Sequence, residues 1–160
     1  MITDLAQTGM QRMRAKAHSN CVVCSPANGR SLCLKFTASD DGGVEACFHC
    51  DRAFEGYAGI LHGGVIASLL DGAMTNCMFA CGTPAMTAEL AVRFRHPVIV
   101  NRVAQVRAWV ERSSPPLHVL KAAVLQDEQL KATAIGKFME RAGLNTETHG
   151  LPGNESAAGV

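Results

Sequence analysis

The chain has 160 residues and a formal net charge of +1; 48% of the residues are hydrophobic and 18% are charged. This length suits one domain with a sizeable core. The nearly neutral charge excludes strong electrostatic attraction to nucleic acid or to a membrane surface, so neither partner is expected. The first twenty residues lack the apolar core of a secretion signal, and no apolar run approaches 18 residues, which predicts a cytoplasmic protein.

Both ends of the chain differ from its middle. Residues 1–20 are expected to form an N-terminal extension that can hold a short amphipathic helix over residues 3–16, laid over a sheet edge. Residues 21–140 carry the folded domain. Residues 141–160 contain mostly Gly, Asn, Ser, Thr and Pro, which cannot bury enough apolar surface, so we expect a flexible tail.

Seven cysteines are scattered through helix and strand patterns, which favours small buried side chains in a reducing compartment. Cys21 and Cys24 form a Cys-x-x-Cys pair, which is half of a tetrahedral zinc site. Cys47, His49 and Cys50 are the candidates for the other half. Strand alternation sends Cys47 and His49 to the face opposite Cys50, so we predict no metal site.

Strand patterns surround one helical segment. Two runs, 32–36 and 44–48, flank a turn at 39–43 and predict a hairpin. Four more strands are predicted after the helix, at residues 86–95, 102–111, 118–125 and 130–139, with a turn at 126–129 between the last two. The first two of these strands alternate between two sets of side chains with a period of two. Two strands, one helix and four strands favour an α+β domain with a single antiparallel sheet curled around the helix.

The helix predicted over residues 62–78 is apolar around most of its circumference, as expected of a buried helix. A narrow polar seam of Ser68, Asp71 and Thr75 is the exception. A carboxylate is costly to bury unless it is paired or takes part in chemistry, which makes Asp71 a candidate catalytic residue. Gly72 beside it indicates close approach by another element.

Gly63 and Gly64 start this helix, where backbone N–H groups lack intrahelical partners and the helix dipole is positive. The pair either forms an anion or oxyanion site or only makes a tight turn into the helix. Eight residues separate Gly63 from Asp71, which is roughly 12 Å along one axis. Both groups must lie near the reacting atom, so a two-fold dimer is expected to bring Asp71 of one chain to Gly63 of the other.

The sequence resembles the hotdog-fold acyl-CoA thioesterases of the PaaI type, over residues 21–139. The likeness is carried by Tyr57-Ala58-Gly59-Ile60-Leu61-His62-Gly63-Gly64, Leu69-Leu70-Asp71 and Ala73-Met74. The resemblance implies one curved antiparallel sheet wrapped around a long central helix. It also implies hydrolysis of acyl-CoA to free acid and CoA by a homodimer or dimer of dimers. CoA is then part of the substrate, and no further cofactor is expected.

The resemblance also implies roles for particular residues. The N–H of Gly63, assisted by Gly64, polarises the thioester carbonyl, and Asp71 of the partner activates water or attacks directly. His62 fixes the loop or caps the helix. Some relatives carry a hydroxyl at the position of Thr87 that orients the water, although an ordinary strand residue is an equal alternative there. Some relatives also carry an oxyanion-binding Asn where this chain has Gly56.

Two other functions remain open. The fold can serve as a non-catalytic acyl-CoA binding module, because fold does not fix function. Hotdog dehydratases and hydratases are a less favoured alternative, because they use a His where this chain has Tyr57. The acyl-pocket candidates are Phe54, Tyr57, Met74 and Met78, and the candidate cations for CoA phosphates are Arg93, Arg95, Arg102, Lys131 and Lys137.

Overall fold

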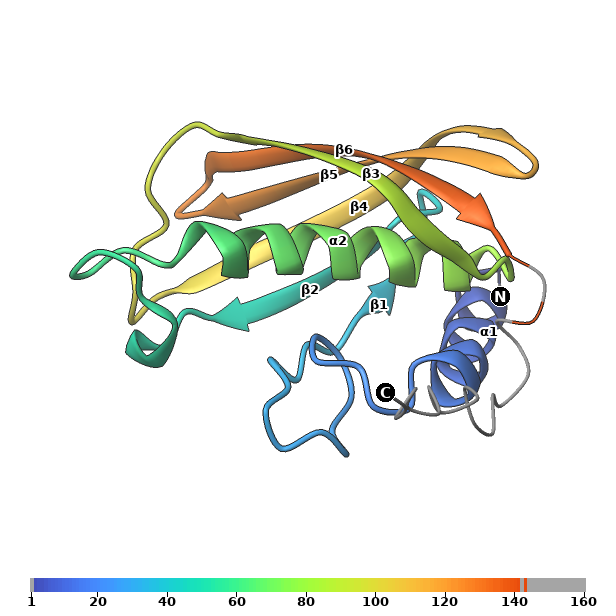
Figure 1. Ribbon diagram of the computed structural model, residues 1–160, viewed down its shortest axis with the longest axis horizontal. Coiled ribbons are helices and arrows are strands. Elements are labelled where there is room, and N and C mark those ends of the chain that lie inside the picture. Colours follow the sequence, from blue (N-terminus) through green and yellow to red (C-terminus); the bar gives the residue numbers. More distant parts are fainter. Residues whose placement is uncertain (1, 142, 144–160) are drawn as a thin grey trace, which may run out of the picture.

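The computed structural model describes residues 2–141 and residue 143, and the rest of the expected C-terminal tail lies outside these residues. The described residues form a six-stranded antiparallel sheet in the order β1-β2-β4-β5-β6-β3 (Figure 1). Its strands are β1 (Thr37–Ala38), β2 (Val44–His49), β3 (Ala85–Phe94), β4 (Val103–Ser114), β5 (Leu117–Gln126) and β6 (Gln129–Glu140). The five strands predicted from residue 44 onward are confirmed, with small shifts at their ends.

Helix α2 (Gly63–Ala80) lies along the inner face of the curved sheet and contacts β2 to β6 (Figure 1). The predicted helix is confirmed and continues two residues further. Leu69, Leu70, Ala73 and Met74 are fully buried beneath the sheet. Burial of this kind contributes about 1.5–3 kcal/mol for each large apolar side chain, so helix and sheet stabilise one another. The α+β arrangement predicted from the order of elements is confirmed.

The strand predicted over residues 32–36 is wrong, and only β1 pairs with β2 in this region. The N–H groups of Leu32 and Leu34 donate to the carbonyls of residues 22–23 over 2.8 and 3.0 Å instead of to a strand. Cys33 between them has a φ of 53°, which no regular strand adopts. The alternation of buried and exposed side chains survives in this segment, and that alternation suggested a strand.

Helix α1 (Ile2–Ala17) packs against α2 and touches β1, the edge strand of the sheet. The predicted N-terminal helix is therefore present, and its main contact is α2. Met10 is fully buried, whereas Leu5 is 76% exposed. Within the described residues, no helix combines the length and apolar character needed to cross a bilayer.

Strand β3 contains a bulge that changes which residues face α2. Thr87 pairs with Phe138 and Glu89 pairs with Lys137, the next residue back along β6, so Ala88 is the extra residue. Before the bulge Thr87 faces α2; after it Leu90 and Val92 pack against the core. The uninterrupted alternation predicted over residues 86–95 is therefore wrong at this point.

Candidate active site

Asp71 lies half-buried in the middle of α2, at the wall of a cavity of about 310 Å³. Thr87 Oγ1 of β3 donates a hydrogen bond to Asp71 Oδ1 over 2.6 Å. The other residues lining the cavity include His18, Thr75, Phe79 and Met86. The structure therefore brings together Asp71, Thr75 and Thr87 from the predicted residues, whereas Ser68 donates to the carbonyl of Gly64.

Burial raises the pKa of Asp71, because the carboxylate loses contact with water. The hydrogen bond from Thr87 and the charge of His18 lower that pKa in part, and the nearby Cys21 raises it again. The net effect is a raised pKa. A carboxylate with a raised pKa is a stronger base than an exposed aspartate, which suits it to accept a proton near neutral pH.

The start of α2 offers one free backbone donor. His62 is the N-cap, and its Nδ1 accepts a hydrogen bond from the N–H of Gly64 over 2.9 Å. That N–H is therefore engaged within the chain. No group among the described residues accepts a hydrogen bond from the N–H of Gly63. The ring of Phe94 flanks this point, 3.5 Å from where a Cβ on Gly63 would lie.

Position 56 supplies no second side-chain donor. A Cβ on Gly56 would lie 3.1 Å from Cδ2 of His62, so a side chain there requires the capping ring to shift by a few tenths of an ångström. The N–H of Gly63 is therefore the donor that the start of α2 offers among the described residues.

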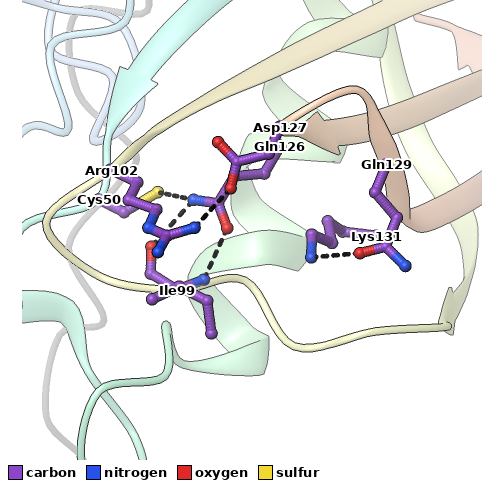
Figure 2. A network of polar contacts seen from close by, with 7 residues as sticks. All are labelled: Cys50, Ile99, Arg102, Gln126, Asp127, Gln129 and Lys131. Carbon is purple, nitrogen blue, oxygen red and sulfur yellow. Dashed lines mark hydrogen bonds and ion pairs between the residues drawn. The ribbon is translucent and has the colours of Figure 1, made fainter.

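Gln126 belongs to the predicted turn at 126–129, and its buried side chain fixes the backbone of Ile99 near the start of α2. Gln126 is 2% exposed; its Oε1 accepts from the N–H of Ile99 over 2.8 Å and its Nε2 donates to the carbonyl of Ile99 over 2.9 Å (Figure 2). The neighbouring Val98 carbonyl accepts from the N–H of Leu61 over 2.8 Å. Gln126 thus anchors the segment that leads into Gly63, and no local pattern in the sequence signals this role.

The free N–H of Gly63 and the carboxylate of Asp71 do not meet within one chain. Gly63 and Asp71 lie on the same straight helix, so about 12 Å along its axis separates them. The candidate site thus has two separate halves, a backbone donor at the helix start and a carboxylate in its middle.

The predicted cations differ in their surroundings. Arg102 pairs with Asp127 and Lys137 pairs with Glu89, each over 2.7 Å, and Lys131 is buried and donates to Gln129 (Figure 2 shows the first and third contacts). The side chains of Arg93 and Arg95 have no ion pair among the described residues and line a second cavity of about 410 Å³.

The predicted acyl-pocket residues are not gathered around Asp71. Met74 and Met78 are fully buried core residues. Tyr57 is 83% exposed, and Phe54 packs on Phe48 with ring centroids 5.8 Å apart. The cavity beside Asp71 is lined instead by residues from α2, β3 and the end of α1.

The cysteines only partly match the sequence expectation. Cys24, Cys50 and Cys77 are buried, Cys21 is half-buried, and the others are exposed: Cys33, Cys47 and Cys81. The alternation in β2 is confirmed, because Cys47 and His49 are exposed while Cys50 is buried. The residue that does join Cys21 and Cys24 is His18, which the sequence reasoning did not consider.

Solved structures share this architecture. Escherichia coli PaaI superimposes with a TM-score of 0.75 at 17% identity, covering 89% of this chain and 98% of that one. A Streptococcus mutans protein solved with acetyl CoA bound gives a TM-score of 0.64 at 16% identity, covering 68% and 88%. A curved antiparallel sheet around a long helix with these neighbours defines a hotdog-fold protein.

The sequence matches point to the same group. Residues 58–133, which include the whole of α2 and β3, match the sequence model of the Thioesterase superfamily. Acyl-coenzyme A thioesterase THEM4 of Bos taurus is 26% identical over 107 residues, which are 66% of this chain and 44% of THEM4. The chain thus spans less than half the length of this relative. The chain thus has the hotdog fold, and its residues 58–133 are similar to the thioesterase superfamily.

Proposed function

We propose that this protein hydrolyses acyl-CoA thioesters to the free acid and CoA. The observation that carries the proposal is the half-buried carboxylate of Asp71, oriented by Thr87 on a cavity wall. A thioester carbonyl has little resonance protection, so hydrolysis needs a placed water, a base and a donor for the developing oxyanion. The name of THEM4 and the acetyl CoA bound to the S. mutans protein support this substrate class.

The proposed chemistry uses Asp71 in one of two ways. As a general base it takes a proton from water while the water oxygen bonds to the carbonyl carbon; the C–S bond then breaks and the CoA sulfur receives the proton. As a nucleophile it displaces the CoA thiolate and forms a mixed anhydride, which water then cleaves to two carboxylates. In both cases the N–H of Gly63 stabilises the oxyanion.

We propose that the two halves of the site meet across a homodimer. Strand β3 is an unpaired edge, ten residues long, and hydrogen bonds only to β6 among the described strands. Met86 and Phe94 on it are 45% and 54% exposed. A long exposed edge with apolar side chains is a template for another strand, and a second copy of β3 supplies one with two-fold symmetry.

The outer face of the sheet supports further association into a dimer of dimers. Val103 and Trp109 of β4 and Ile135 and Met139 of β6 are each between 36% and 53% exposed. These large apolar residues stand on the face away from α2. Exposed large apolar side chains on one sheet face are typical of surfaces that contact another protein chain.

A mixing experiment tests the shared site. Asp71→Asn removes the carboxylate and Gly63→Pro removes the N–H, so each homodimer should be inactive against acyl-CoA. When the two variants are refolded together, half of the dimers are hybrids with one intact site of two. Thiol release should recover to about a quarter of the wild-type rate. If both halves act within one chain, mixing restores nothing and the shared site is wrong.

Wild-type activity is tested with a panel of short, medium and aromatic acyl-CoAs, following release of the CoA thiol. Release of thiol from at least one member, faster than without protein, is the expected result. Tight binding of the same ligands without any release would instead identify a non-catalytic acyl-CoA binding module.

We also propose a cytoplasmic location. All seven cysteines are free in the structure, although several are close to one another. Unpaired cysteines in this number are typical of a reducing compartment.

A further inference from the structure

Three metal-binding side chains converge in the segment that follows α1. His18, Cys21 and Cys24 stand at every third position, and the chain turns tightly through them: the N–H of Cys21 donates to the carbonyl of His18 over 3.2 Å, and that of Ser25 to the carbonyl of Cys21 over 3.0 Å. As a result, one donor atom from each of the three side chains lies within 4.8 Å of the other two.

The cluster contains polar atoms that nothing in the described residues satisfies. Cys24 is 3% exposed, and Nδ1 of His18 is buried without a hydrogen-bond partner. Asn76 of α2 is fully buried and interacts with Cys24, and its Oδ1 also lacks a partner. An unpaired buried polar atom is destabilising, so two in the residues around one thiol pair indicate a missing ligand.

The geometry points to a Zn²⁺ site formed by His18, Cys21 and Cys24. Two sulfurs and one imidazole nitrogen are donors that zinc prefers, at about 2.3 and 2.0 Å. Tetrahedral coordination at those lengths places donors within about 4 Å of one another, so only small side-chain shifts are needed. The N–H of Val23 donates to Sγ of Cys21 over 3.3 Å, which supports a metal-bound thiolate.

Charge and access both suit the ion. Binding releases the two thiol protons to solvent, and Zn²⁺ with two thiolates carries no net charge, so the site buries little uncompensated charge. A cavity of about 310 Å³ lined by Arg14, His18 and Cys24 reaches the cluster from the surface and gives the ion a path. Water completes the fourth position of the tetrahedral site.

The role of this zinc is to hold the segment after α1 against α2. Val23, between the two cysteines, packs so closely on Gly72 that a Cβ there would lie 2.5 Å from Cγ1 of Val23. His18 also lines the cavity that contains Asp71. The metal therefore fixes one wall of that cavity, and its binding does not depend on the proposed hydrolysis.

Cobalt titration of the full chain tests the site. The protein is reduced, stripped with a chelator and titrated with Co²⁺, then with Zn²⁺. We expect one equivalent of Co²⁺ with thiolate-to-cobalt charge transfer, displaced by Zn²⁺, and a higher Tm with Zn²⁺. Cys24→Ser and His18→Gln should weaken binding at least about tenfold, since even outer-shell changes cost 10–100-fold. Cys47→Ser, which changes an exposed cysteine outside the cluster, should bind normally.

A second measurement needs no variant. Zn²⁺ should protect Cys21 and Cys24 of the wild type from alkylation, while Cys33 and Cys47 remain fully labelled by peptide mass spectrometry. The proposal is overturned if wild type takes up no stoichiometric metal, if protection is equal at all four cysteines, or if Cys47→Ser loses binding as Cys24→Ser does. A Cys21 to Cys24 disulfide in protein purified without oxidant, persisting with Zn²⁺ present, would also overturn it.

Discussion

The two halves of the candidate site are built in opposite ways. At the start of α2 the candidate group is the backbone N–H of Gly63, positioned by the His62 cap, which accepts from the N–H of Gly64, and by the loop that Gln126 anchors. In the middle of the helix it is the side chain of Asp71, half-buried and oriented by Thr87. The first half depends on where the backbone runs, and the second depends on which side chains surround one carboxylate.

The two halves therefore respond differently to substitution. A backbone donor survives most substitutions at its own position, because every residue except proline carries an N–H. A buried carboxylate has no such tolerance, since its charge, its hydrogen bond and its surroundings all set its pKa.

Replacing the carboxylate should have the largest effect. Asp71→Asn keeps the shape of the side chain and removes the base, so kcat for thiol release should fall about 10²–10⁴-fold with little change in KM. Steady-state kinetics on the best acyl-CoA measures this. Asp40→Asn, which changes an exposed carboxylate in the turn between β1 and β2, serves as the matched control. Equal turnover by wild type and Asp71→Asn would remove Asp71 from the reaction.

Removing the backbone donor should come next. Gly63 is the first residue of α2, where proline fits without breaking the helix, and His62 has the extended ψ of 135° that a residue before proline requires. Gly63→Pro should lower kcat about 10²–10³-fold, as loss of one oxyanion donor does. Gly63→Ala keeps the N–H and meets Phe94 only at 3.5 Å, so it should stay near wild type. Similar losses in both variants would contradict a role for the N–H.

The pH profile of hydrolysis should test the carboxylate half of the site. Because burial raises the pKa of Asp71, the acidic limb of kcat/KM should lie above pH 3.8, the usual value, and activity should be lost as pH falls through the raised pKa. Thr87→Val removes a hydrogen bond that lowers this pKa, so the limb should move to higher pH. Thr87→Ser should leave it in place. A limb that is the same in all three proteins would show that Asp71 does not control it.

The smallest effect concerns the support of the carboxylate half. Gly72→Ala places a Cβ 2.5 Å from Cγ1 of Val23, and such overpacking should lower the free energy of unfolding by about 1–3 kcal/mol. Val23→Ala in the same chain should recover part of that loss. Gly9→Ala in α1 meets nothing within 4 Å and should be neutral or stabilising. Urea unfolding is measured for the wild type, for the single variants Gly72→Ala, Val23→Ala and Gly9→Ala, and for the double variant; additive losses in the double variant would refute the contact.

Much of the fold was predictable because burial leaves a periodic trace in the sequence. The apolar circumference of residues 62–78 predicted α2, and strict alternation predicted β4, where Ala104, Val106 and Ala108 are all buried. The failure at residues 32–36 has a local cause: Cys33 takes a positive φ, and nothing in its neighbours reveals that. Alternation reports which side chains are buried but not what the backbone hydrogen bonds to.

The candidate site was predictable where a residue type lowers stability unless it makes a specific contact. Asp71 in an apolar helix and Gly72 beside it both signalled contact with another element, and the structure gives Thr87 and Val23 as those contacts. His18 was missed because Cys21 and Cys24 were compared only with cysteines and a histidine further along the chain. The spacing of His18 before the two cysteines was the available signal. Gln126 had none, because its partner Ile99 is distant in the sequence.

The bulge at Ala88 changes which alternate residues of β3 face α2. Upstream of it the inward set includes Thr87, which serves the carboxylate; downstream the inward set is Leu90 and Val92, which fill the core. Deleting one residue here removes that change, so either the hydroxyl of Thr87 or the side chains of Leu90 and Val92 must face outward. Inserting or deleting two residues in β3 keeps the same side chains facing α2, whereas inserting or deleting one residue exchanges the inward and outward sets.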